Sequence, residues 1–239
     1  GRWRGGAGGG GGGASGRCAA QGAKVGSVGR DGDAAGRLAA RRRDAGVQAI
    51  GLGADVSKQV EVQQAVSAAR EQYGNADILF NHAGTLIVKP FLDIEESEWD
   101  WLMGVNVKSM FLMTKAVLPQ MLEKGRGSIV CTSSISAVCA TPGEVLYDAT
   151  KGACHMFARA IAVEYRDRGI RCNALAASVA STPIACRSRS SRIPCGVRMN
   201  PGASAVQRMP RSRDPTAIAR ATMRPVPLVP AANHSPRVA

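Results

Sequence analysis

Residues 23–28 read AKVGSV, residues 34–44 read AAGRLAARRRD, and residues 47–52 read VQAIGL. The first and third segments are short apolar runs of the kind found in strands, and the longer middle one is typical of a helix that ends before Gly46. We therefore predict strands at Ala23–Val28 and Val47–Leu52 with a helix at Ala34–Asp44 between them. A strand, a helix and a strand in this order form a right-handed crossover between parallel strands.

The same alternation continues to about residue 183. We expect further strands at Asp77–Phe80, Ser128–Thr132 and Ile170–Leu175. We expect further helices from a cap at Ser57 to about Tyr73, over Glu98–Glu123, and over Tyr147–Arg166. This alternation predicts an α/β fold with a Rossmann-like, doubly wound parallel sheet covered on both faces. The ligand site of such a fold lies beyond the carboxyl ends of the strands.

Both ends of the chain depart from this pattern. Gly5 to Gly13 is nearly all glycine, and residues 184–239 are rich in Arg, Pro and Ser without a lasting period. We predict three parts: a Gly-rich region 1–22, a folded core 23–183, and a mostly disordered tail 184–239. The first residue is not Met, so we expect a fragment or an incomplete gene model.

The net charge of +13 lies mainly at the two ends. Residues 184–239 hold ten arginines and one acidic residue, whereas residues 23–183 hold 18 basic and 17 acidic residues. Because the excess does not form a patterned face of the core, we expect no nucleic-acid partner. Binding of a polyanion by the Arg-rich tail is a less favoured alternative.

The cysteines and the hydropathy indicate the compartment. Seven scattered cysteines without a Cys-x-x-Cys pair argue against a disulfide framework or a metal site and favour a reducing, cytoplasmic location. No apolar run reaches the ~18 residues that a membrane-spanning helix needs, so we expect no membrane partner.

Three side chains of the core are spaced for proton transfer. Tyr147 and Lys151 stand four residues apart, at helical spacing, and Ser134 lies thirteen residues before the tyrosine. Residues four apart share one face of a helix, so the lysine ammonium can lie beside the phenol and lower its pKa. The same spacing also fits an amphipathic helix with an exposed lysine, and the context must decide.

That context lies at the ends of the predicted strands. Asp55-Val56 and Asn81-His82-Ala83-Gly84 follow two of them, and Asn106 lies in the long predicted helix. With Ser133-Ser134, Tyr147-x-x-x-Lys151 and the run Gly169 to Asn173, this set resembles the short-chain dehydrogenase/reductase family. The resemblance runs from about Gln21 to Thr182.

The resemblance implies a role for each residue of the site. Tyr147 would be the acid/base that protonates a carbonyl oxygen, and Lys151 would lower its pKa and hold the nicotinamide ribose. Ser134 would hydrogen-bond the substrate oxygen, and Asn106 would anchor a water that links Lys151 to solvent. A polar surface position is the alternative for Asn106, and His82 is expected to pack or hydrogen-bond rather than act as a base.

The resemblance also implies a nicotinamide cofactor. Its expected contacts are Gly5, Gly9, Gly11, Arg30, Asp55, Val56, Asn81, Ala83, Gly84, Tyr147, Lys151 and Thr182. Relatives that prefer NAD carry an acid after the second strand, whereas NADP binders carry basic residues there. Gly29-Arg30 therefore favours NADP over NAD, and Asp31 keeps NAD open.

Two departures from the family pattern concern the ends. Only four residues precede Gly5, so we expect the first strand of the sheet to be missing. Ala177-Ser178 stands where the family usually has Pro-Gly, and we expect the Arg-rich tail to replace the family's C-terminal elements. We expect both ends to be frameshifted or mis-joined.

The sequence thus predicts an NAD(P)(H)-dependent oxidoreductase that interconverts a small-molecule ketone and a secondary alcohol. The alternative is a catalytically inactive remnant of the family, frameshifted or truncated, with a structural or oligomer-partner role. By resemblance alone, we expect a homodimer or a homotetramer.

Overall fold

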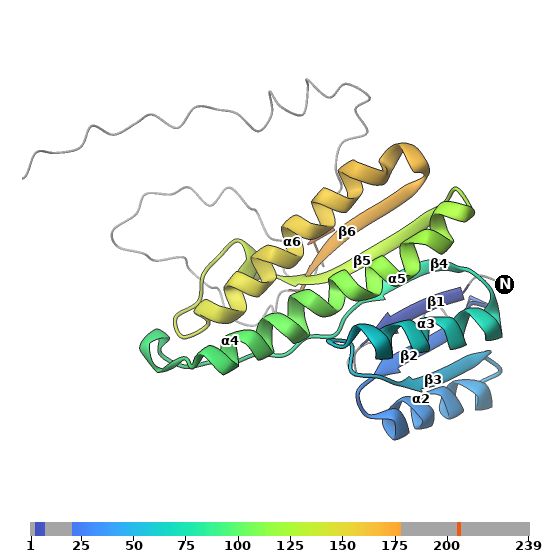
Figure 1. Cartoon of the computed structure of the whole chain (residues 1–239), viewed down its shortest axis with the longest axis horizontal. Coiled ribbons are helices and arrows are strands. Elements are labelled where there is room, and N and C mark those ends of the chain that lie inside the picture. Colours follow the sequence, from blue (N-terminus) through green and yellow to red (C-terminus); the bar gives the residue numbers. More distant parts are fainter. Residues whose placement is uncertain (1–2, 8–20, 178–204, 207–239) are drawn as a thin grey trace, which may run out of the picture. The chain divides into compact units, whose positions relative to one another are not determined.

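The computed structural model describes residues 3–7, 21–177 and 205–206. Its strands form one sheet in the order β3-β2-β1-β4-β5-β6-β7 (Figure 1). The strands are β1 Trp3–Ala7, β2 Lys24–Gly29, β3 Ala49–Gly53, β4 Ala76–Asn81, β5 Gly127–Ser134, β6 Ile170–Ala177 and β7 Ala205–Val206. The α-helices are α2 Gly32–Asp44, α3 Gln59–Tyr73, α4 Glu96–Met103, α5 Ser109–Glu123 and α6 Val145–Tyr165. The shorter helical turns are η2 Phe91–Asp93, the π-helical η3 Gly104–Lys108, η4 Ile135–Ala137 and η5 Arg166–Arg168.

The pairing of the strands confirms the predicted doubly wound fold. Strands β1 to β6 are parallel, and β7 pairs antiparallel with the end of β6. The crossover through α2 moves across the sheet in one direction, and those through α3, α5 and α6 move in the other. Because these crossovers are right-handed, α2 covers one face and the other three helices cover the opposite face. The direction changes between β1 and β4, which is where ligands bind in this architecture.

The prediction that the first strand is missing was wrong. Trp3–Ala7 forms β1 in the middle of the sheet, where Gly5 lies opposite Gly26 of β2 and Leu79 of β4. The prediction assigned Gly5 to a loop, but pairing uses backbone N–H and C=O groups, which glycine also carries. Part of region 1–22 therefore belongs to the core. Most of the tail, for which disorder is predicted, lies outside the described residues.

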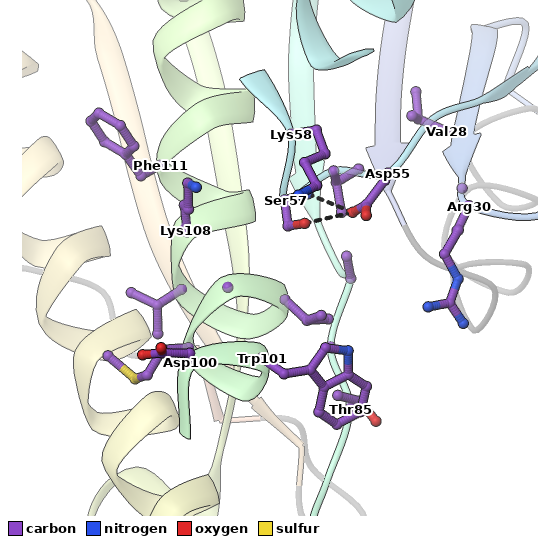
Figure 2. Close-up of a pocket in the computed structure, with 18 residues that line it drawn as sticks. Val28, Arg30, Asp55, Ser57, Lys58, Thr85, Asp100, Trp101, Lys108 and Phe111 are labelled. Carbon is purple, nitrogen blue, oxygen red and sulfur yellow. Dashed lines mark hydrogen bonds between the residues drawn. The ribbon is translucent and has the colours of Figure 1, made fainter. Parts of the chain in front are cut away.

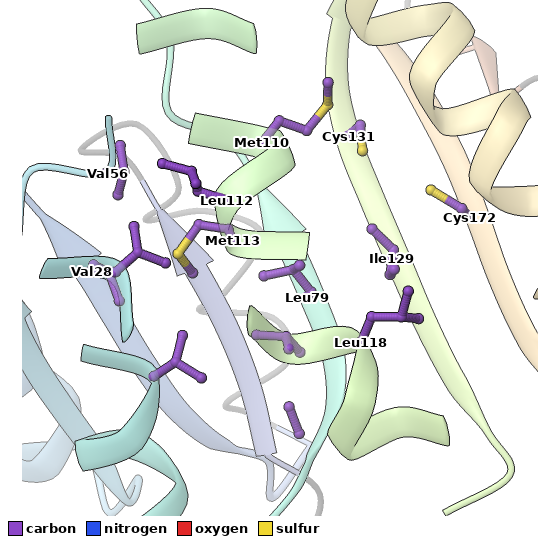
Figure 3. Packing of buried hydrophobic residues seen from close by; sticks show 14 of the residues in the cluster. Val28, Val56, Leu79, Met110, Leu112, Met113, Leu118, Ile129, Cys131 and Cys172 are labelled. Carbon is purple, nitrogen blue, oxygen red and sulfur yellow. The ribbon is translucent and has the colours of Figure 1, made fainter. Parts of the chain in front are cut away.

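A hydrophobic cluster of buried side chains lies between the sheet and the helices that pack on it (Figure 3). Leu79 of β4 and Ile129 of β5 are completely buried, and Met113, Val117 and Met121 of α5 face them. Burial of one such side chain contributes about 1.5–3 kcal/mol. This packing fixes α5, and with it the polar turn η3 that precedes it, against the central strands.

Two helix predictions need correction. The predicted helix Glu98–Glu123 is divided into α4 and α5 by the π-helical turn η3. Ser57 does not cap α3, whose N-cap is Lys58, because the Ser57 hydroxyl donates to Asp55 instead. Within the described ranges, no helix is both long and apolar enough to cross a membrane.

Candidate active site

Ser134 is the last residue of β5 and the N-cap of η4. Its hydroxyl accepts a hydrogen bond from the Ser136 amide at 3.1 Å and donates one to the Ser136 hydroxyl, also at 3.1 Å. A serine is well suited to end a strand in this way, because its side chain can bond to nearby backbone groups. The nearly buried hydroxyl is thereby held at the carboxyl edge of the sheet.

Tyr147 and Lys151 lie one turn apart in the first half of α6. The Lys151 ammonium is 5.4 Å from the centroid of the Tyr147 ring. It also donates a hydrogen bond to the carbonyl oxygen of Thr132 at 3.1 Å. The side chain of Ser134 lies close enough to the Tyr147 phenol to lower its pKa. The end of β5 and the start of α6 therefore bring the serine, the tyrosine and the lysine together.

Burial shifts the pKa of both titratable groups in the direction of their neutral forms. Burial raises the pKa of Tyr147; the side chain of Ser134 opposes this rise, and the nearby carboxylates of Glu144 and Asp148 add to it. Burial lowers the pKa of Lys151. Burial thus outweighs the influences that lower the pKa of the phenol, and the expected lowering by Lys151 stays a prediction. At neutral pH Tyr147 carries its proton, which is the state that a general acid requires.

Asn106 lies in the π-helical turn η3 and is almost completely buried. Its Oδ1 accepts from the Thr85 amide at 2.8 Å, and its Nδ2 donates to the Thr85 carbonyl at 2.9 Å and to the Thr150 hydroxyl at 3.0 Å. The turn also exposes the Asn106 carbonyl to the Cys154 thiol, which donates to it at 3.3 Å. These bonds exclude the alternative of a polar surface position. Single π-helical turns within helices occur frequently at functional sites.

Thr150 belongs to the site and was not predicted. Its completely buried hydroxyl accepts from Asn106 and donates to the carbonyl of Tyr147 at 2.8 Å. It thus connects the π-helical turn to the helix that carries the phenol. The available signal was its position directly before Lys151 and three residues after Tyr147, which is on the same side of a helix.

Residues after β4 separate this cluster from a large cavity. Gly84 lies directly beside the cluster, because a Cβ added there would lie 3.4 Å from both the Lys151 ammonium and Asn106 Oδ1. Asn81 connects β4 to its neighbours, since its Nδ2 donates to the Thr114 hydroxyl at 3.0 Å and to the Cys131 thiol at 3.7 Å. Ala83 and Gly84 both line the cavity.

The cavity measures about 1070 Å³ and opens at the carboxyl ends of the strands (Figure 2). Its wall includes Arg30 after β2, Asp55 and Val56 after β3, and one face of the helical segment α4–η3–α5. Asp55 Oδ1 accepts from the Ser57 amide at 2.9 Å and from the Ser57 hydroxyl at 2.7 Å. These bonds lower the pKa of Asp55, and the positive charges of Lys58 and Arg30 lower it further.

His82 packs against one neighbouring side chain and hydrogen-bonds another. Its Nδ1 lies 3.0 Å from the Thr132 hydroxyl, and its ring stacks on Phe80 with 5.1 Å between centroids. Burial, and secondarily the charge of Lys151, lower the pKa of His82. The prediction of a packing and hydrogen-bonding residue is confirmed.

The structure thus brings together most of the predicted site residues. Ser134, Tyr147, Lys151 and Asn106 form one cluster, and Arg30, Asp55, Val56, Ala83 and Gly84 line the neighbouring cavity. Gly5 is placed differently from the prediction, because it lies within β1 and not in a loop after it. The predicted contacts Gly9, Gly11 and Thr182 lie outside the described residues.

Comparison with known proteins agrees with this geometry. The model of the short chain dehydrogenase family matches residues 4–192. The chain belongs to this family. One curated relative, the oxidoreductase UcpA of Salmonella typhimurium, is 41% identical over 133 residues, which are 55% of this chain and 51% of the relative. The chain therefore spans about half the length of that short-chain dehydrogenase relative.

Solved structures of other family members share the fold. The 3-ketoacyl-(acyl-carrier-protein) reductase of Brucella melitensis, complexed with NADH, is 33% identical with a TM-score of 0.70, over 77% of this chain and 78% of that chain. The gluconate 5-dehydrogenase of Burkholderia cenocepacia, in complex with NADP and tartrate, is 31% identical with a TM-score of 0.68, over 74% of this chain and 70% of that chain. This chain is thus similar to one protein solved with NADH and to another solved with NADP.

Proposed function

We propose that this short-chain dehydrogenase interconverts a ketone and a secondary alcohol, with Tyr147 as the acid/base. The observation that carries the proposal is the cluster itself: the Lys151 ammonium lies over the Tyr147 ring, Ser134 lies close enough to the phenol to affect its pKa, and Gly84 lies between this cluster and the cavity. A protonated phenol beside a serine hydroxyl offers two donors to one substrate oxygen. This arrangement suits a reaction in which a carbonyl oxygen gains a proton.

In the reduction, Tyr147 gives its proton to the carbonyl oxygen while the Ser134 hydroxyl turns its proton from Ser136 to donate a hydrogen bond to the same oxygen. The phenolate left behind is stabilised by the ammonium of Lys151, whose Nζ is 5.4 Å from the ring centroid. In the oxidation, the phenolate takes the proton back from the alcohol. Thr150 and Asn106 hold the backbone and the turn around this group.

The cavity fits a nicotinamide dinucleotide. It lies where the crossover direction changes, the site at which such sheets bind dinucleotides. Its volume of about 1070 Å³ is ample, since drug-sized ligands occupy about 300–1000 Å³. Asp55, Val56, Ala83 and Gly84 would hold the cofactor along this wall. When bound, the cofactor supplies or takes up the hydride.

We favour NADP as this cofactor. The Arg30 side chain lies at the wall of the cavity, where it can meet a 2′-phosphate. Asp31 is otherwise engaged, because its Oδ1 accepts from the Ala34 amide at 2.8 Å and caps α2. An acid committed to a helix cap is less available to the ribose hydroxyls of NAD.

We also propose that the protein self-associates through α5 and α6. Phe111 of α5 and Met156 and Val163 of α6 are 45–58% exposed although they are apolar. Such side chains, where they gather on one face, mark contact surfaces. Light scattering of the purified protein should give the mass of a dimer or a tetramer, and the mass of a monomer would refute this.

The central test measures oxidation and reduction of a panel of secondary alcohols and ketones by the purified chain, with each cofactor. The proposal expects turnover that Tyr147→Phe abolishes while cofactor still binds. Titration with NADPH, followed by the fluorescence of the bound nicotinamide, reports binding separately. Saturable binding without turnover would refute the reaction, and no binding at millimolar cofactor would favour the inactive remnant.

A further inference from the structure

The segment from Thr85 to Lys89, which follows β4, contacts both helical parts of the candidate active site. At its start, the Thr85 amide and carbonyl bond to the Asn106 side chain at 2.8 and 2.9 Å. At its end, the Lys89 amide donates to the carbonyl of Gly143 at 2.9 Å. Gly143 lies two residues before the start of α6, and Tyr147 is the third residue of that helix.

The side chain of Lys89 fixes this end of the segment to a third element. Its ammonium donates to both carboxylate oxygens of Glu98 in α4, at 3.0 and 2.8 Å. Glu98 is itself held, because its Oε2 accepts from the Glu95 amide at 2.9 Å in the capping box of α4. Both side chains of the pair are about 30% exposed. Lys89 therefore joins the first turn of α4 to the turn before α6.

The contact at Gly143 requires a close approach of two backbones. Gly143 has a φ of +80°, which favours glycine. A Cβ added there would lie 3.4 Å from Val88 Cγ1. The turn continues into α6 through bonds from the Glu144 amide to the Thr141 carbonyl and from the Thr141 amide to Asp148 Oδ2 at 2.9 Å.

From these contacts we propose that Lys89 is a positioning residue for Tyr147. It holds the turn at Gly143, and so the first turn of α6, at a fixed place relative to Ser134. The role given to Tyr147 rests on the proposed function, whereas the physical connection between Lys89 and α6 does not. Removal of the Lys89 charge should loosen residues 140–148 and leave distant parts of the fold unchanged.

The test compares Lys89→Met with a matched control, Arg70→Met. Arg70 makes an ion pair with Glu123 at 3.1 Å that is more exposed and far from this turn in the sequence. Hydrogen exchange should become about two- to fivefold faster in peptides that cover residues 140–148 in the Lys89 variant, as expected for a partly exposed pair. The Arg70 control should leave these peptides unchanged, and Lys89→Arg should restore protection. Unchanged exchange in Lys89→Met would overturn the proposal.

A second measurement separates positioning from simple loosening. The tyrosinate absorbance of the protein, minus that of the same protein with Tyr147→Phe, gives the titration of Tyr147 alone. Since burial raises the pKa of this phenol, Lys89→Met should shift it down toward its ordinary value. Faster exchange with an unchanged Tyr147 titration would refute the positioning role. Neither measurement needs turnover, so an inactive chain would refute the proposed function and leave this inference standing.

Discussion

Replacement of Asn106 by alanine should destabilise the fold strongly, although no hydrophobic contact is removed. The side chain makes three hydrogen bonds in a buried place, two to the Thr85 backbone and one to the Thr150 hydroxyl. At about 1 kcal/mol for each bond, the free energy of unfolding should fall by about 3 kcal/mol. The loss of unfolding free energy should not be smaller than this, because alanine cannot replace the hydrogen bonds that the Asn106 side chain makes to the Thr85 amide and carbonyl.

Equilibrium unfolding in urea measures the effect. With a slope of about 2 kcal/mol per M, the midpoint should fall by about 1.5 M. Asn75→Ala is the control, since the Asn75 amide bonds to Glu123 at 2.8 Å on a more exposed surface and should cost less than about 1 kcal/mol. Equal losses in the two variants, or a loss of less than about 1 kcal/mol for Asn106→Ala, would refute the assignment of Asn106 as the connection between β4 and α6.

Three further predictions concern the site. Tyr147→Phe should lower kcat by at least about 100-fold and leave the Kd for the cofactor within twofold, as measured by steady-state kinetics and fluorescence titration. Arg30→Ala should weaken the binding of NADPH by about tenfold or more, which is the contribution of a charge-assisted hydrogen bond, and should weaken the binding of NADH much less. An equal loss of affinity for the two cofactors would contradict the 2′-phosphate contact. His82→Asn should reduce the pH dependence of stability: because the folded pKa of His82 is lowered, the native protein loses stability as pH falls below the unfolded value of about 6.5. The urea midpoint should therefore drop less between pH 7.5 and 5.5 in this variant than in the wild type.

The strands and helices of the core were predictable because short apolar runs alternate along the chain with longer helical segments. Strand β4 contains one such apolar run, in which Leu79 is completely buried. The strand β1 was not predictable, because glycines supply no side-chain pattern and only the backbone pairing with β2 and β4 reveals it. Sequence periodicity thus reports burial, and it fails where the backbone alone makes the contact.

In the candidate site, too, only part of the arrangement was predictable from the sequence. The spacing of Tyr147 and Lys151 on one helix follows from local geometry, so the sequence predicted their proximity. The contacts of Asn106 could not be predicted, because they depend on a π-helical turn that inserts one residue and redirects the side chain toward Thr85 and Thr150. Such an insertion leaves a helical sequence pattern almost unchanged. Contacts between segments therefore required the structure.

The pKa values of the cluster bear on how Lys151 would help the reaction. A buried phenol and a buried ammonium each lose favourable hydration, so the pKa of Tyr147 is raised and that of Lys151 is lowered. The attraction between ammonium and phenolate exists only once the proton has left Tyr147. The ammonium lies 5.4 Å from the ring centroid, and two unit charges at about that separation attract each other by about 3 kcal/mol at an effective dielectric constant of about 20. An interaction that appears only as charge develops lowers the barrier without stabilising the starting state. Lys151 would therefore ease the loss of the proton, although burial keeps the net pKa of the resting phenol raised.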